Sequence, residues 1–81
     1  MPIKSINRKI IAYLKKHNLV GKFAKQKFLF EQSPLHPSLQ TEKLEPKSVE
    51  LYSFRVDKKY RAIFRIRNSQ AEIVIVTKHY E

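Results

Sequence analysis

The chain has 81 residues, and 17 Lys and Arg against 7 Asp and Glu give it a formal net charge of +10. This length predicts one domain, residues 1–81, with a small core, and excludes large doubly wound sheets and barrels. Cysteine is absent, which excludes disulfides and thiolate metal sites. No apolar run reaches the roughly 18 residues of a membrane span, so we expect a cytoplasmic protein with no membrane partner.

The excess positive charge suggests a polyanionic partner, because like charges in a small domain repel one another unless something compensates them. Nucleic acid, an anionic membrane surface and an acidic protein all fit this charge. Solubility alone is a further explanation. The charge therefore narrows the partner to these classes without choosing among them.

The first part of the chain is predicted to be helical. Apolar side chains recur at helical spacing from residue 3 to residue 17, with lysines between them, so we expect an amphipathic helix there. Ser5 and Asn7 are both candidates to cap its start. Residues 2–5 are alternatively a short strand that leads into the helix.

A second helix is predicted over residues 19–32, after Asn18, which suits the left-handed conformation that often ends a helix. Pro34 stops this helix because the residue before a proline, here Ser33, is pushed out of helical geometry. Residues 33–48 contain three prolines and are predicted to be irregular. A loop of this length in so small a domain is uncommon and is often functional.

Three strands are predicted in the second half, over residues 49–56, 60–67 and 72–78. The first two alternate, with aromatic side chains on one face and polar or basic ones on the other. The third is apolar on both faces and is therefore predicted to be the central strand. Two N-terminal helices packed on one face of this small antiparallel sheet make an α+β fold.

Basic side chains gather on the face of this sheet that lies away from the helices. Alternation predicts that Arg55, Arg61 and Arg65 are exposed there, with Lys58 and Lys59 in the adjoining turn. The planar fork of arginine matches phosphate oxygens two at a time, so we expect this face to bind RNA or another phosphodiester. Arg61 stands out because an unpaired cation in the middle of a strand is costly. It needs a carboxylate, a ligand or a wet groove.

The last predicted strand is followed by His79 and Tyr80, beside the arginine face. No second His or acidic residue lies at ligand spacing, so no metal site is predicted. One glycine in the whole chain cannot build a phosphate-binding loop or a dinucleotide-binding motif. We therefore expect neither a metal ion nor a cofactor.

Three stretches of the second half carry a family resemblance. They are His-Pro-Ser-Leu at 36–39, Lys-Leu at 43–44, and Tyr-Ser-Phe-Arg-Val-Asp-Lys-Lys-Tyr-Arg-Ala-Ile-Phe-Arg at 52–65. Together they resemble the RelE/ParE toxin superfamily of type II toxin–antitoxin systems. The His79-Tyr80 ending is similar to the YoeB-like branch, which has an arginine at the spacing of Arg61 and a glutamate at the spacing of Glu42.

The resemblance implies a compact α+β fold of the microbial ribonuclease kind. RelE-like and YoeB-like members cut mRNA in the ribosomal A site without a metal, and an antitoxin covers and neutralises them. ParE-like members share the fold, poison DNA gyrase and lack the nuclease residues. The leading hypothesis is therefore a ribosome-dependent mRNA endoribonuclease with an acidic antitoxin as partner. A gyrase inhibitor and an inactive RNA-binding relative are the alternatives.

The implied chemistry assigns roles to four residues. Metal-free RNA cleavage uses the ribose 2′-hydroxyl as nucleophile, and it needs a base, cations for the phosphorane charge and an acid for the leaving oxygen. Glu42 or His79 is the candidate base, and Arg61, helped by the neighbouring strand arginines, stabilises the phosphate. His79 is the candidate acid if it is not the base, and Tyr80 orients or stacks on an RNA base.

Overall fold

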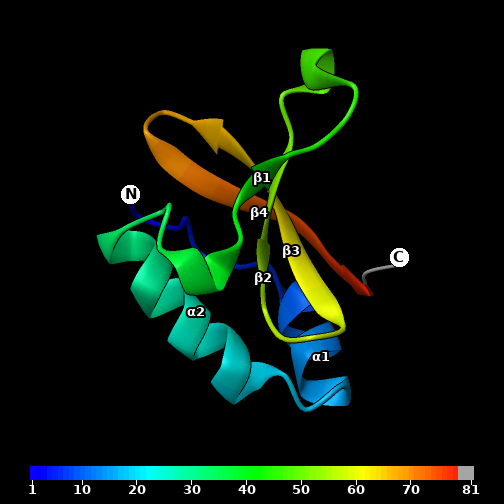
Figure 1. Ribbon diagram of the computed structural model, residues 1–81. Helices are drawn as coiled ribbons and strands as arrows, with labels where there is room; N and C mark the ends of the chain where they lie inside the picture. The colour runs from blue at the N-terminus through cyan, green and yellow to red at the C-terminus, as the bar shows by residue number, and fades with distance from the viewer. Residues whose placement is uncertain (79–81) are drawn as a thin grey trace.

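The computed structural model describes residues 1–78, so the predictions for His79 and Tyr80 lie outside the described residues. A four-stranded sheet has the order β1-β2-β3-β4, and each neighbouring pair is antiparallel. The elements are α1 (Arg8–Lys16), α2 (Val20–Gln32), η1 (Pro37–Leu39), β1 (Glu42–Lys43), η2 (Lys47–Val49), β2 (Tyr52–Arg55), β3 (Tyr60–Arg67) and β4 (Gln70–Lys78). Figure 1 shows both helices on the same side of the sheet, which confirms the predicted α+β architecture.

The start of α1 is set by Asn7, whose side-chain oxygen accepts a hydrogen bond from the Ile10 amide at 2.9 Å. Asn18, at a φ of 55°, turns the chain between the two helices. The predicted first helix is too long at its start, because Ile3 lies outside it and bridges Ala71 in parallel. For these first residues the strand alternative is the better description.

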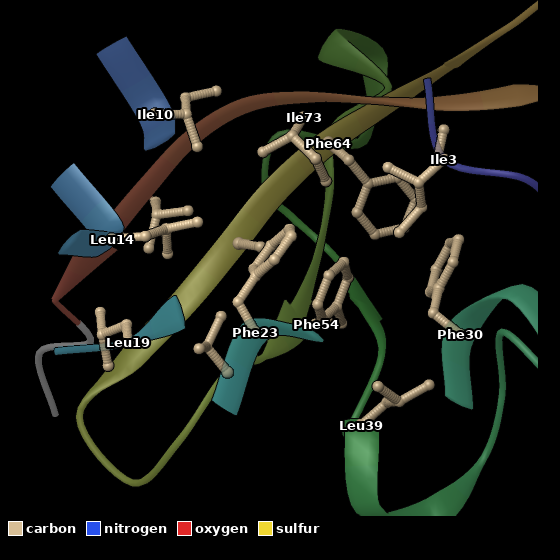
Figure 2. Packing of buried hydrophobic residues seen from close by; sticks show 14 residues of the cluster. Ile3, Ile10, Leu14, Leu19, Phe23, Phe30, Leu39, Phe54, Phe64 and Ile73 are labelled. Atoms are coloured by element: carbon tan, nitrogen blue, oxygen red, sulfur yellow. The ribbon is translucent and has the colours of Figure 1, made fainter. Parts of the chain in front are cut away.

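Aromatic rings from α2 and the sheet form the centre of the core, which Figure 2 shows from close by. Phe30 of α2 lies 5.1 Å from both Phe54 and Phe64, measured between ring centroids. Phe23, seven residues before Phe30 in α2, lies 6.1 Å from Phe54, also between ring centroids. Burying one such side chain contributes about 1.5–3 kcal/mol, so the aromatic face of the sheet fixes α2 in place.

The strand β4 lies at one end of the strand order, so the prediction that it is central was wrong, and β3 is an inner strand. The apolar pattern on both faces has a local cause. Ile63 pairs with Ile75 and Phe64 pairs with Ile73, so Val74 is an extra residue in a β-bulge. Val74 and Ile75 are 45% and 49% exposed, so this part of β4 is apolar without being buried.

The segment predicted as irregular, residues 33–48, contains the short strand β1. Glu42 pairs with Ser53 and Lys43 pairs with Tyr52, so β1 extends the sheet beyond β2. A strand of two residues is too short to show an alternating pattern. The strand predicted over 49–56 is also shorter at its start, because η2 and a left-handed Glu50 precede it.

Candidate active site

The sheet face away from the helices brings together residues from three strands. Phe54 points into the core, so its neighbours Ser53 and Arg55 point to the opposite face, as alternation requires. Arg61 of β3 is the register partner of Arg55, and Glu42 of β1 is the register partner of Ser53. The pairing of β1, β2 and β3 therefore places a carboxylate and two guanidinium groups in one neighbourhood.

Arg61 is only 8% exposed, so the prediction that it lies open on the sheet face was wrong. Its Nε donates a hydrogen bond to the Ser53 hydroxyl at 2.9 Å. Its Nη2 donates to the Ser53 carbonyl at 3.3 Å and to the Gln40 carbonyl. Within residues 1–78, no group accepts a hydrogen bond from its Nη1. The segment around Gln40 and β1 covers the guanidinium and holds it in one orientation.

Two glutamines that sequence reasoning missed build this enclosure. Gln40 follows η1 with a φ of 45°, and its carbonyl is the acceptor for Arg61. The buried Gln26 amide donates to the Ser38 carbonyl at 3.2 Å and to the Arg55 carbonyl at 2.8 Å. It thereby ties η1 and β2 to α2. No sequence signal reveals Gln40, because it acts through a backbone carbonyl that every residue has.

Glu42 stands at the open side of Arg61. Its Oε1 lies 3.9 Å from the Arg61 Nε, and its side chain is 56% exposed. Burial lowers the pKa of the Arg61 guanidinium, the Glu42 carboxylate raises it and Arg55 lowers it, with a lowered pKa as the net result. A guanidinium stays protonated at neutral pH even so. The site therefore pairs a fixed cation with a carboxylate that water and ligands can reach.

A depression of about 220 Å³ opens beside these residues. It is lined by Glu42, Leu44, Ser53, Arg61, Ile63, Thr77 and Lys78. Lys78 belongs to β4, where it pairs with Tyr60 at the start of β3. His79 follows Lys78 directly in the sequence. The predicted arginine, the predicted glutamate and the residue before the predicted histidine thus share one depression.

Solved toxin structures have the same arrangement of helices and sheet. The chain superposes on a YoeB/ParE toxin from Agrobacterium tumefaciens with a TM-score of 0.72 and 16% identity, over 99% of this chain and 100% of that one. The chain has the YoeB/ParE toxin fold. A YoeB–YefM complex from Staphylococcus aureus gives a TM-score of 0.71 and 17% identity, over 99% of this chain and 100% of that one.

A YoeB dimer from Staphylococcus aureus superposes equally well, with a TM-score of 0.71 and 17% identity, over 98% of this chain and 94% of that one. No family model matches this chain, and no curated protein matches it in sequence. The fold expected from the RelE/ParE resemblance is therefore confirmed by structure, at identities too low for a sequence comparison to detect.

Within this YoeB/ParE fold, Arg65 does not join Arg61. The two are four residues apart on β3, a separation of about 13 Å along a strand. The Arg65 Nε donates to the Glu72 carboxylate at 2.8 Å, its Nη2 contacts the same oxygen, and the Lys4 ammonium lies 3.4 Å from the other oxygen. The hydrogen bond from Arg65 lowers the pKa of Glu72. The charge of Arg65 is thus already paired.

Lys58 and Lys59 lie in the turn between β2 and β3, exposed as predicted. They line a second depression, of about 550 Å³, together with Arg55. The structure therefore groups Lys58 and Lys59 with Arg55, at the opposite end of the sheet face from Arg65.

No group of three His, Asp or Glu side chains within residues 1–78 is placed to hold a metal ion. No helix in this part of the chain has both the length and the apolar character needed to cross a membrane.

Proposed function

We propose that this protein is the toxin of a type II toxin–antitoxin system, with residues 1–81 as one toxin domain. We propose further that it is a metal-free mRNA endoribonuclease that acts on the ribosome in the cytoplasm and so inhibits translation. The observation that carries the proposal is Arg61, a buried guanidinium fixed by neutral oxygens beside an accessible carboxylate. The YoeB/ParE fold supports it.

In the proposed reaction, the ribose 2′-oxygen attacks the phosphorus and loses its proton to a base. The bond from phosphorus to the 5′-oxygen breaks, and that oxygen takes a proton from an acid, which leaves a 2′,3′-cyclic phosphate and a 5′-hydroxyl. Negative charge grows on the phosphate oxygens in the transition state. Arg61 suits this charge because Ser53 and Gln40 hold its Nε and Nη2, so its Nη1 can donate to a phosphate without reorientation.

Glu42 and His79 are the proposed proton-transfer groups. A phosphate bound to Arg61 would lie next to Glu42, whose carboxylate is 3.9 Å from the guanidinium, within reach of the attacking hydroxyl. His79 is the alternative base and otherwise the acid, since the unperturbed pKa of histidine, about 6.5, suits proton transfer near neutral pH. Tyr80 would orient or stack on an RNA base.

We propose an acidic antitoxin as the resting partner, and mRNA on the ribosome as the active one. A Staphylococcus aureus toxin of this fold is found in complex with YefM. The formal charge of +10 suits an acidic protein and RNA alike, because both present negative groups. The same basic surfaces can therefore serve a silent state and an active state in turn.

Induction of the protein in growing cells, followed by mapping of mRNA 5′ ends, tests this function. We expect growth arrest and new ends inside translated codons. Intact mRNA together with defective DNA supercoiling would instead identify a ParE-like gyrase inhibitor. Normal growth without cleavage would identify an inactive RNA-binding relative.

A further inference from the structure

The turn between β2 and β3 forms a strongly basic depression with the start of α2. Its volume is about 550 Å³, against about 220 Å³ for the depression at Arg61. It is lined by Lys22, Arg55, Asp57, Lys58 and Lys59. Four cationic side chains against one carboxylate leave a formal excess of three positive charges.

The one carboxylate is engaged by the protein itself. One oxygen of Asp57 accepts hydrogen bonds from the Lys59 amide at 2.8 Å and the Tyr60 amide at 2.9 Å. The other oxygen is 3.1 Å from the Lys22 ammonium. Asp57 therefore shapes the turn and draws Lys22 of α2 toward it, while the Lys22 side chain stays 60% exposed. Asp57 offsets one of the four positive charges, and a formal excess of three remains in the depression.

Arg55 connects this depression with the proposed catalytic one. It lines the basic depression, and it is the register partner of Arg61 across β2 and β3. In the opposite direction along β3, Arg61 is followed by Arg65, whose guanidinium is hydrogen-bonded to the Glu72 carboxylate. A polyanion bound at Arg61 meets Lys78 within the same depression, and toward the turn it meets the further cations Arg55, Lys58 and Lys59.

We infer that the depression formed by Lys22, Arg55, Lys58 and Lys59 binds a backbone phosphate of the RNA strand that neighbours the phosphate at Arg61. The strand accordingly runs from Arg61 over Arg55 to the β2–β3 turn and the start of α2. This inference rests on the proposed function and gives the RNA a path that the function alone does not specify.

The lining favours RNA over an acidic protein segment as the occupant. Among residues 1–78, every residue that lines the depression is charged, and none is aromatic or aliphatic. Protein segments that bind stably bury aromatic or aliphatic anchors in pockets. Backbone phosphates of a single strand need only cations, and their binding weakens steeply with salt.

A charge-matched pair of triple variants tests the inference. One variant carries Lys22→Gln, Lys58→Gln and Lys59→Gln; its control carries Lys15→Gln, Lys16→Gln and Lys25→Gln, three exposed helix lysines that do not line the depression. The measurement is the Kd of a fluorescent 2′-O-methyl RNA hexamer, which cannot be cleaved, across a salt series.

We expect the turn variant to lose about 0.7 in the slope of log K against log salt, the value for the single phosphate contact assigned to the depression. We expect the control to change far less. Equal losses in the two variants would mean that only net charge matters, and would overturn the inference. Loss of binding to an acidic decapeptide with RNA binding unchanged would assign the depression to a protein and would also overturn it.

Methylphosphonate substitution locates the contact along the RNA. Neutralising one phosphate at a time should weaken binding to the wild-type protein most at the scissile phosphate and at one neighbour. At that neighbour the turn variant should show no further loss, because the two changes remove the same contact. Additive losses at every position would contradict a local site.

The outcomes separate this inference from the proposed function, because binding of an uncleavable RNA requires neither ribosomes nor catalysis. If mRNA is cleaved and both triple variants bind alike, the path is wrong and the nuclease function stands. If no mRNA is cleaved and only the turn variant loses its salt slope, the phosphate site stands and the nuclease function fails.

Discussion

Two arginines on β3 differ in what their charge is free to do. Arg65 is exposed, and its guanidinium is hydrogen-bonded to the Glu72 carboxylate. Arg61 is 8% exposed, and its hydrogen bonds go to the neutral oxygens of Ser53 and Gln40. The more accessible arginine is therefore the one that donates directly to a carboxylate, whereas the Glu42 carboxylate stays 3.9 Å from the Arg61 Nε. Neutral oxygens orient the enclosed arginine, which suits the binding of a phosphate in a fixed geometry.

The two ends of the sheet face also differ in how far carboxylates offset their positive charge. At the β3–β4 end, Glu72 lies between Arg65 and Lys4. At the β2–β3 end, the carboxylate of Asp57 is engaged by backbone amides and one lysine, and three further cations remain around it. A count of basic residues along the sequence does not distinguish these ends, whereas the position of the carboxylates does.

The largest expected effect comes from Arg61→Lys. Lysine keeps the positive charge but cannot hold the two-pronged geometry, so cleavage of ribosome-bound mRNA should fall by roughly 10²–10³-fold. Arg65→Lys is the matched control on the same strand and should retain activity within about 3-fold, because that side chain is paired outside the site. Thermal unfolding of both proteins checks that each is folded. Equal cleavage rates for the two variants would contradict the different roles of Arg61 and Arg65.

Ser53→Ala should give the next largest effect, since it removes the hydroxyl that fixes the Arg61 Nε. A buried donor left without its acceptor costs about 1–3 kcal/mol, so unfolding should become easier by that amount. We expect kcat to fall roughly 10-fold with little change in KM, because Ser53 positions Arg61 and need not touch RNA. Ser48→Ala, at an exposed serine, is the control. A change in KM alone would assign Ser53 to RNA binding.

Acid should lower the stability of the fold more through Asp57, at the β2–β3 turn, than through Glu72, at the β3–β4 end. Partial burial raises the pKa of Asp57, but hydrogen bonds from the Lys59 amide, Lys22 and the Tyr60 amide outweigh it, so the pKa lies below its ordinary value of 3.8. The stabilisation is complete above that ordinary pKa and is lost as the pH falls below 3.8 toward the folded-state pKa.

Urea unfolding of Asp57→Asn measures this effect. We expect a loss of about 1 kcal/mol at pH 7 and almost none once the carboxyl is protonated in the folded wild-type protein. Glu72→Gln, at the other end, should change the stability less at every pH because its partners are on the surface. A difference between wild type and Asp57→Asn that is the same at all pH values would show that charge is not the cause.

The smallest effect is expected for RNA binding by Glu72→Gln. This change releases Arg65, which can then contact at most one phosphate, so the salt slope should rise by no more than about 0.7. The hexamer titration described above measures it, with wild type as reference. A gain larger than the loss in the turn variant would mean that the RNA runs toward Arg65.

The sequence predicted local features well because they depend on near neighbours. Alternation predicted that Ala62 and Phe64 lie on the helix face. Asn7 was one of two predicted caps, with Ser5 as the other, and Asn18 was predicted to be left-handed. The likeness to RelE/ParE toxins led to the right fold. The hypothesis was that Arg61 needs a carboxylate, a ligand or a wet groove, and the structure places the Glu42 carboxylate 3.9 Å from its Nε. The hydrogen bonds to the Ser53 and Gln40 oxygens were not predicted.

What the sequence could not predict depends on pairing between distant segments. The bulge at Val74 gave an edge strand the apolar pattern of a central one. The burial of Arg61 requires β1, whose two residues carry no pattern of their own. Lys22 was missed because it meets Asp57 only after α2 packs on the sheet, across 35 residues of sequence. None of these contacts is encoded in a local motif.

NMR of the arginine side-chain Nε–Hε groups during titration with 2′-O-methyl RNA tests the contrast between the two arginines most directly. The hydrogen bond from the Arg61 Nε to Ser53 should slow its exchange with water and keep its signal visible. We expect saturable shifts at Arg61 and Arg55 and an unchanged signal at Arg65. A saturable shift at Arg65, with Arg61 unchanged, would contradict it.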